Sequence, residues 1–175
     1  MSQNIVQHSE INGISLVGFR LSPESENPDW YTLFTYGQKD IPVKDNDQVV
    51  FFKSLGLVDR AYALFDDNIK SLFPPPSELD LICDVAEMLY IINNEDRDES
   101  ATIVNGLNTI FDLLKATKMN LPSEYKEILY RFADHLTFNR EFAAYLNRYA
   151  VTREAITNAI IWGIGAITIR SRILE

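Results

Sequence analysis

Alternating apolar and polar positions in the first third of the chain predict β-strands. In residues 14–21, Val17 and Phe19 share one face at a period of two. Residues 30–36 alternate aromatic with β-branched or aliphatic side chains, which suit a pleated surface. Residues 48–53 are apolar on both faces, which favours a central strand that is covered on both sides. Together these segments predict an antiparallel meander of about three strands.

Beyond the third strand the apolar period lengthens to that of an amphipathic helix. Ser54 is a suitable N-cap, and Leu57, Ala61 and Phe65 form an apolar stripe behind it. We therefore expect one helix that packs on the sheet and ends around Asp66.

Three consecutive prolines, Pro74–Pro76, then prevent any helix from crossing this point, because proline lacks a backbone donor and restricts the residue before it. The sheet before them needs cover on both faces, and the chain after them is rich in apolar helix. Each part therefore needs the other. We predict a single domain over residues 1–175, in which the prolines form a rigid corner between a sheet-plus-helix part (1–73) and a helical part (77–175).

The helical part is predicted to begin with a central helix over residues 78–92. This segment is apolar almost all round, which is typical of a buried helix, apart from a stripe formed by Asp80, Asp84 and Glu87. Further helices are expected at about 99–116, 123–136, 138–149 and from 153 onward. Residues 165–170 are rich in β-branched side chains, so a strand remains an alternative there. The predicted fold class is α+β, a meander with one packed helix followed by a four- to five-helix layer.

Charge and length restrict the expected partners. The net charge of −9 disfavours nucleic acid as a general partner. Residues 115–175 are the more basic part of the chain, which leaves RNA or DNA contact through that part open as an alternative. The longest apolar-rich segment, residues 155–169, is too short and too polar to span a bilayer, so no membrane span is predicted.

One cysteine, Cys83, excludes an intramolecular disulfide, and the N-terminal residues lack a signal-peptide pattern. Both observations favour a cytoplasmic location. Cys83 would lie on the central helix between carboxylates, which raise a thiol pKa and favour a structural role. The two histidines belong to no helical metal-binding pair, and phosphate-loop and serine-elbow motifs are missing. We therefore predict no metal, no cofactor and no catalytic residue.

Three sets of residues remain as candidate sites. Asp80, Asp84 and Glu87 could serve as acid and base in a pocket, could form a solvated edge, or could pair with arginines of the basic part. Small side chains four residues apart on the last helix would let another helix approach closely. These are Ala155, Ala159 and Gly163. Residues of types that are enriched in interfaces also cluster on the last two helices. These are Tyr145, Arg148 and Arg153.

The leading functional hypothesis is a non-enzymatic cytoplasmic interaction or regulatory protein that self-associates or binds a protein partner. The alternative is a small-molecule-binding protein or hydrolase-like enzyme with a pocket between sheet and helices. The alternative predicts a deep, partly polar cavity beside the carboxylates of the central helix. The aromatic strand from Trp30 to Tyr36 fits core packing against the first helix, or a half-exposed contact surface.

Overall fold

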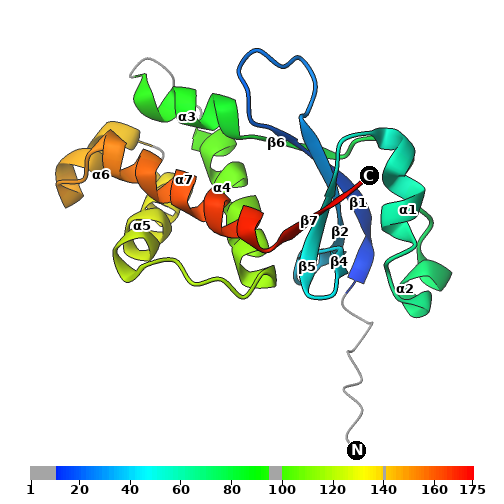
Figure 1. Ribbon diagram of the computed structural model, residues 1–175. Helices are drawn as coiled ribbons and strands as arrows, with labels where there is room; N and C mark the ends of the chain where they lie inside the picture. Colours follow the sequence, from blue (N-terminus) through cyan, green and yellow to red (C-terminus); the bar gives the residue numbers. More distant parts are fainter. Residues whose placement is uncertain (1–10, 95–99, 140) are drawn as a thin grey trace, which may run out of the picture.

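A β-sheet runs through the middle of the molecule between two layers of helices (Figure 1). The computed structural model describes residues 11–94, 100–139 and 141–175. In these residues seven strands form one sheet in the order β4-β5-β2-β1-β6, with β3 beside β2 and β7 beside β5. The strands are β1 (Ile11–Arg20), β2 (Trp30–Gly37), β3 (Ile41–Pro42), β4 (Lys44–Asp45), β5 (Gln48–Phe52), β6 (Leu81–Asp84) and β7 (Ser171–Leu174). The fold class is α+β, as the sequence predicts.

The antiparallel core of the sheet follows the predicted meander. Strands β1 and β2 pair over most of their length, from Ile14 opposite Thr35 to Phe19 opposite Trp30. Strand β5 is buried on both faces, and Val49 and Phe52 have no exposed surface. Successive side chains of a strand point to opposite faces, so these strands supply two separate apolar surfaces.

Two parallel strands from the helical part complete the sheet and correct the sequence-based prediction. The predicted central helix over residues 78–92 begins only at Val85, because residues 81–84 form β6 and pair in parallel with residues 17–20 of β1. At the other end of the chain, the last helix ends at Ile169. Strand β7 follows it and pairs in parallel with β5. The segment 165–170 is therefore helical except for its last residue.

One face of the sheet is covered by two short helices, α1 (Val58–Tyr62) and α2 (Asp67–Leu72), which follow a 3-10 turn at Leu55–Leu57 (Figure 1). The sequence predicts one helix here that ends around Asp66, whereas the structure has two, because α1 ends at Tyr62 and α2 begins at Asp67. The Asp66 carboxylate accepts hydrogen bonds from the backbone N–H groups of Asn68 and Ile69, at 2.9 and 3.0 Å, and so starts a new helix.

The opposite face carries the larger layer of helices (Figure 1). They are α3 (Val85–Asn93), α4 (Ser100–Ala116), α5 (Ser123–Asn139), α6 (Phe142–Tyr149) and α7 (Arg153–Ile169). The core of this layer is continuous with the sheet through Val17, Phe19 and Val49. It contains the fully buried side chains of Met88 and Phe132.

The proline segment leads from α2 to β6, and the residue just before β6, Asp80, is hydrogen-bonded to β1. The backbone N–H of Leu16 donates to the Asp80 carboxylate at 2.8 Å, and the backbone N–H of Asp80 donates to the Leu16 carbonyl at 3.0 Å. The single domain stays a prediction. It is supported by the pairing of β6 with β1 and of β7 with β5, because both pairs join the part before the prolines to the part after them.

Candidate ligand pocket

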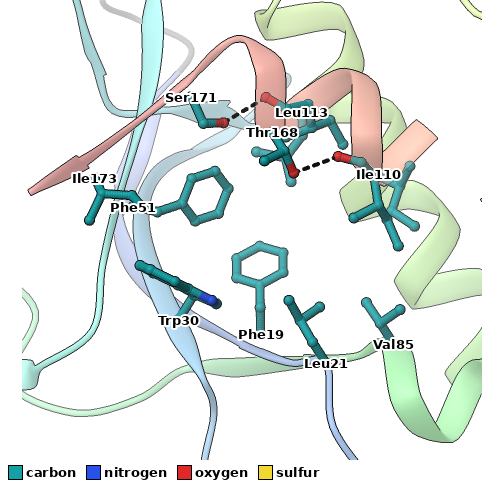
Figure 2. Close-up of a pocket in the computed structure, with 12 residues that line it drawn as sticks. Phe19, Leu21, Trp30, Phe51, Val85, Ile110, Leu113, Thr168, Ser171 and Ile173 are labelled. Carbon is teal, nitrogen blue, oxygen red and sulfur yellow. Dashed lines mark hydrogen bonds between the residues drawn. The ribbon is translucent and has the colours of Figure 1, made fainter. Parts of the chain in front are cut away.

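A hollow of about 270 Å³ lies between the sheet and the larger helical layer. Figure 2 shows the rings of Phe19, Trp30 and Phe51 on the sheet side, facing Ile110 and Leu113 of α4 across the hollow. The remaining lining residues come from the end of β1, from α3, from α7 and from β7. They are Leu21, Val85, Ile164, Ile167, Thr168, Ser171 and Ile173.

The three rings reach the hollow because they lie on the same face of three different strands. Phe19 and Phe51 meet edge to face with their ring centroids 5.4 Å apart. Strands β2 and β5 share only one residue pair at this end of the sheet, Tyr31 opposite Phe52. The hydroxyl of Thr32 donates to the carbonyl of Val50 at 2.6 Å and links the two strands there. Side-chain contacts, rather than a continuous row of backbone hydrogen bonds between β2 and β5, therefore form the sheet side of the pocket.

The pocket is almost entirely apolar. Its two hydroxyl groups are already used, since Thr168 donates to the Ile164 carbonyl at 2.9 Å and Ser171 donates to the Ile167 carbonyl at 2.7 Å (Figure 2). None of the twelve lining residues is ionisable. The walls therefore offer surface for an apolar group, but no acid, base or strong nucleophile for a reaction.

Exposed apolar side chains form part of the pocket lining, and one cation lies beside its Trp30 wall. Leu21 and Ile173 are 43% and 51% exposed, which is high for residues of this type that line a hollow. The ammonium group of Lys53 lies 4.7 Å from the centre of the Trp30 ring, a cation–π contact. A ligand in the pocket would thus meet apolar walls inside and a positive charge near the edge.

The three predicted carboxylates do not form a helical stripe beside the pocket. Asp80 precedes β6 and binds the backbone of Leu16. Asp84 caps α3, accepting from the backbone N–H of Glu87 at 2.9 Å, and it also forms an ion pair with Arg20 at 2.5 Å. That pairing raises the pKa of the Arg20 guanidinium. The spacing of these residues was interpreted with a helical period, which is wrong for the strand that contains Asp84.

Cys83 lies in β6 rather than on the predicted helix, and its side chain is buried. Burial raises the pKa of its thiol to about 12. A thiol with so high a pKa carries almost no thiolate at neutral pH, so Cys83 contributes packing rather than nucleophilic chemistry.

The small-residue ridge of the last helix approaches α4 of the same chain at Gly163. Ala159 and Gly163 are buried and Ala155 is half-buried. A Cβ atom added at Gly163 would lie 3.5 Å from Ile110 and 3.6 Å from Leu114, so the two helices approach closely there. The spacing therefore serves a contact inside the chain, and self-association through this ridge stays a prediction.

The predicted patch of Tyr145, Arg148 and Arg153 is not one surface. The Tyr145 side chain is fully buried, and its hydroxyl donates to the Ile128 carbonyl at 2.8 Å. Arg148 lies over the ring of Tyr149, whereas Arg153 lies over the ring of Phe142 and donates to the Ile92 carbonyl. Tyr145 therefore belongs to the core between α5 and α6. A role of the two arginines in an interface stays a prediction.

The aromatic strand β2 packs in the core as the sequence predicts, and its role as a contact surface for a partner stays a prediction. Tyr31 packs in the core on the side of α1 and α2, whereas Trp30 is half-buried and lines the pocket. Sequence reasoning offered a pocket between sheet and helices as an alternative, but placed it beside the carboxylates and missed its aromatic lining. The available signal was the presence of large aromatic residues on both faces of β2 and β5, which is more apolar area than the one predicted packing helix can cover.

A second hollow of about 250 Å³ opens on the other side of the sheet, between the 3-10 turn and the segment that follows the prolines. Its lining mixes apolar side chains such as Leu16 and Leu79 with the acidic side chains of Asp59 and Glu78. It lacks the aromatic enclosure of the first pocket, and no candidate chemistry converges on it.

Searches for other kinds of site gave negative results for the described residues. No group of three or more His, Cys, Asp or Glu side chains is arranged to hold a metal ion in the described ranges. No helix within those ranges has the length and apolar character that crossing a membrane requires.

Comparisons with known proteins do not assign the chain to a family. No protein-family model matches it, and no curated protein matches it in sequence. One solved structure, described as the crystal structure of SatS c-terminal domain in complex with bromine, is 11% identical and gives a TM-score of 0.47. That comparison covers 93% of this chain and 94% of the other.

Proposed function

We propose that the protein is a non-enzymatic binding protein that holds a small apolar group in the pocket between Phe19, Trp30 and Phe51. The observation that carries this proposal is the apolar lining of the pocket, whose two hydroxyl groups are already bonded to backbone carbonyls. A cytoplasmic location, expected from the sequence, remains part of the proposal.

The size of the pocket supports a small ligand. An apolar cavity of about 150 Å³ in another protein binds benzene, and typical ligand pockets hold about 300–1,000 Å³. At about 270 Å³, this pocket fits a ring or a medium-length alkyl chain. Burying apolar surface in it would contribute about 25 cal/mol per Å².

The positions of the carboxylates favour binding over catalysis. Asp80 accepts a hydrogen bond from the backbone N–H of Leu16, and Asp84 forms an ion pair with Arg20. The lining of the pocket contains no ionisable group. The hydrolase-like alternative requires these carboxylates in a cavity. Of the two alternatives, a small-molecule-binding protein and a hydrolase-like enzyme, we therefore propose only the first.

A pocket-filling substitution tests the proposal. Ile164→Phe places a larger side chain on the wall of the pocket, and Ile161→Phe makes the same change one turn away at an exposed position outside it. The probe is 1-octanol, followed by the NMR signal of the Trp30 indole N–H. We expect saturable shifts in the wild type and in Ile161→Phe, and at least a tenfold loss of affinity in Ile164→Phe. Absence of saturable shifts in the wild type, or equal affinity in both variants, would contradict the proposal.

A second candidate function, self-association, is favoured by the edge of the sheet. Strand β7 pairs only with β5 among the described strands, and Ile169 just before it is 74% exposed. An unpaired strand edge is a template for pairing with another chain. Sedimentation equilibrium at micromolar concentration would detect a dimer. Ile169→Lys should dissociate it, whereas Phe138→Lys, at an exposed position of α5, should not; a monomeric wild type would remove this candidate.

A further inference from the structure

The proposed pocket has a cation at its mouth that nothing in the described chain neutralises. Lys53 follows β5 directly and lies two residues after Phe51, so both side chains project from the same face. The Lys53 side chain is exposed, and its ammonium is held over the ring of Trp30, which is itself part of the lining. None of the described ion pairs includes Lys53.

The acidic groups near the same end of the sheet already have partners. The Asp84 carboxylate binds Arg20. The Asp29 carboxylate accepts hydrogen bonds from the backbone N–H groups of Leu21 and Ser22 and from the hydroxyl of Ser25, which hold its pKa below the usual range. Both carboxylates are therefore occupied in fixed local structure, while Lys53 remains available to a ligand.

Building on the proposed function, we infer that the ligand is a small amphiphile with an apolar tail and a carboxylate head. The tail fills the hollow between the three rings and α4, and the carboxylate pairs with the Lys53 ammonium at the mouth. The two hydroxyl groups of the walls already donate to backbone carbonyls, which leaves the Trp30 indole N–H as the side-chain donor that lines the pocket. The charge of the head group is therefore recognised by Lys53, beside the Trp30 ring.

The geometry also selects the sign of the head group. The Lys53 ammonium attracts an anion and repels an amine, and its attraction weakens as salt screens it. The Trp30 ring fixes the ammonium in place, which reduces the side-chain entropy lost when an anion pairs with it. We expect the carboxylate to improve binding several-fold over an uncharged head, as is usual for a partly exposed ion pair.

Three probes of equal chain length test the inference: octanoate, 1-octanol and octylamine, at pH 7.5, low salt and concentrations below micelle formation. Binding is followed by the Trp30 indole N–H signal. We expect octanoate to bind about 2- to 5-fold more tightly than 1-octanol, and octylamine to bind most weakly. The difference between octanoate and octanol should shrink in 0.5 M salt.

A pair of lysine variants supplies the matched control. Lys53→Gln should lower the affinity for octanoate to that for octanol and leave octanol unchanged, and Lys53→Arg should keep the preference. Lys126→Gln removes a lysine that lies over another aromatic ring, Tyr130, on α5 and should change nothing.

The possible outcomes separate the two proposals. Equal binding of octanoate and octanol by the wild type, or a preference for octanoate that survives in Lys53→Gln, overturns the inference and leaves the proposed function standing. If none of the three probes binds to the wild type, both the inference and the proposed function are wrong.

Discussion

The two faces of the sheet use neighbouring aromatic residues for different purposes. On β2, Tyr31 packs toward α1 and α2, whereas Trp30 lines the pocket on the opposite face. On β5, Phe52 has no exposed surface and stacks with Tyr31 at a centroid distance of 6.0 Å, whereas Phe51 is half-buried beside the hollow. A shift of one position along the strand therefore separates a residue that fills a core from one that borders a cavity.

The difference teaches that residue type alone does not decide the role of a large apolar side chain. Both faces receive rings of similar size from the same strands. Around Tyr31 and Phe52 the face toward α1 and α2 is filled because a small helix lies directly on it, with Ala61 fully buried at the contact. The second hollow on this side opens farther away, beside Leu16 and Leu79. On the opposite face, α4 and α7 pack on each other as well as on the sheet, and a hollow remains between these helices and the sheet.

Truncation of the two adjacent phenylalanines should give the largest contrast. Phe52→Ala removes a fully buried ring and should lower the free energy of unfolding by about 3–5 kcal/mol. Phe51→Ala enlarges an existing hollow and loses less contact, so we expect a cost of about 1–2 kcal/mol. Urea unfolding followed by circular dichroism measures both values. Equal losses would mean that the two faces are packed alike, contrary to the comparison.

Removal of the hydroxyl that joins β2 to β5 should have a smaller effect. Thr32 is fully buried, and Thr32→Val leaves the Val50 carbonyl without this donor, at a cost of about 1–2 kcal/mol. Thr32→Ser keeps the donor and serves as the control. The same unfolding measurement applies. A Val variant as stable as the wild type would show that the Thr32–Val50 hydrogen bond is not needed to hold β2 and β5 together beside the pocket.

The smallest expected effect depends on pH and lies in the larger helical layer. Burial, aided by the nearby Asp40 carboxylate, raises the pKa of Asp112 on α4 to about 6 from a usual value of 3.8. The protonated form is therefore favoured in the folded protein. Its contribution to stability is complete below about pH 4 and is lost as the pH rises through 6.

Asp112→Asn should remove this dependence. The variant should become more stable than the wild type by on the order of 1 kcal/mol at pH 7.5, a discounted value because the carboxyl group is only half-buried. The difference between the two proteins should fall to a constant baseline below pH 4. Thermal unfolding between pH 3.5 and 8 measures it, and a difference that does not change with pH would contradict the raised pKa.

The meander and the helices could be predicted because their signals are local. Alternation in residues 14–21 and 30–36 and the apolar stripes of the helices are present in the sequence itself. The segment from Leu81 to Val85 is apolar enough to fit either a helical or a strand pattern. Its pairing with β1 decides for a strand, and that partner lies more than sixty positions earlier. The strand at residues 171–174 is missed for the same reason, because its pairing with β5 joins residues roughly 120 positions apart.

The sequence allowed a pocket between sheet and helices as an alternative, but its position and lining could not be predicted because a hollow depends on the distance between layers. The sequence identifies Trp30 and Phe51 as large apolar residues of two strands, but it does not say how closely α4 and α7 approach them. The candidate carboxylates were chosen with a helical period that does not apply before Val85. Because the pairing of residues 81–84 with β1 was not predicted, the candidate carboxylate site was also placed wrongly.

The parallel pairing of β7 with β5 has a consequence for the order in which the protein can assemble during translation. Residue Val49 emerges from the ribosome roughly 120 residues before Ser171, its partner, which is a delay on the order of ten seconds at typical rates of synthesis. Throughout that interval the edge of β5 that β7 will occupy has no strand beside it. A nascent chain with an uncovered apolar strand is prone to aggregation, so this edge stays exposed for longer than the edge of a local hairpin would.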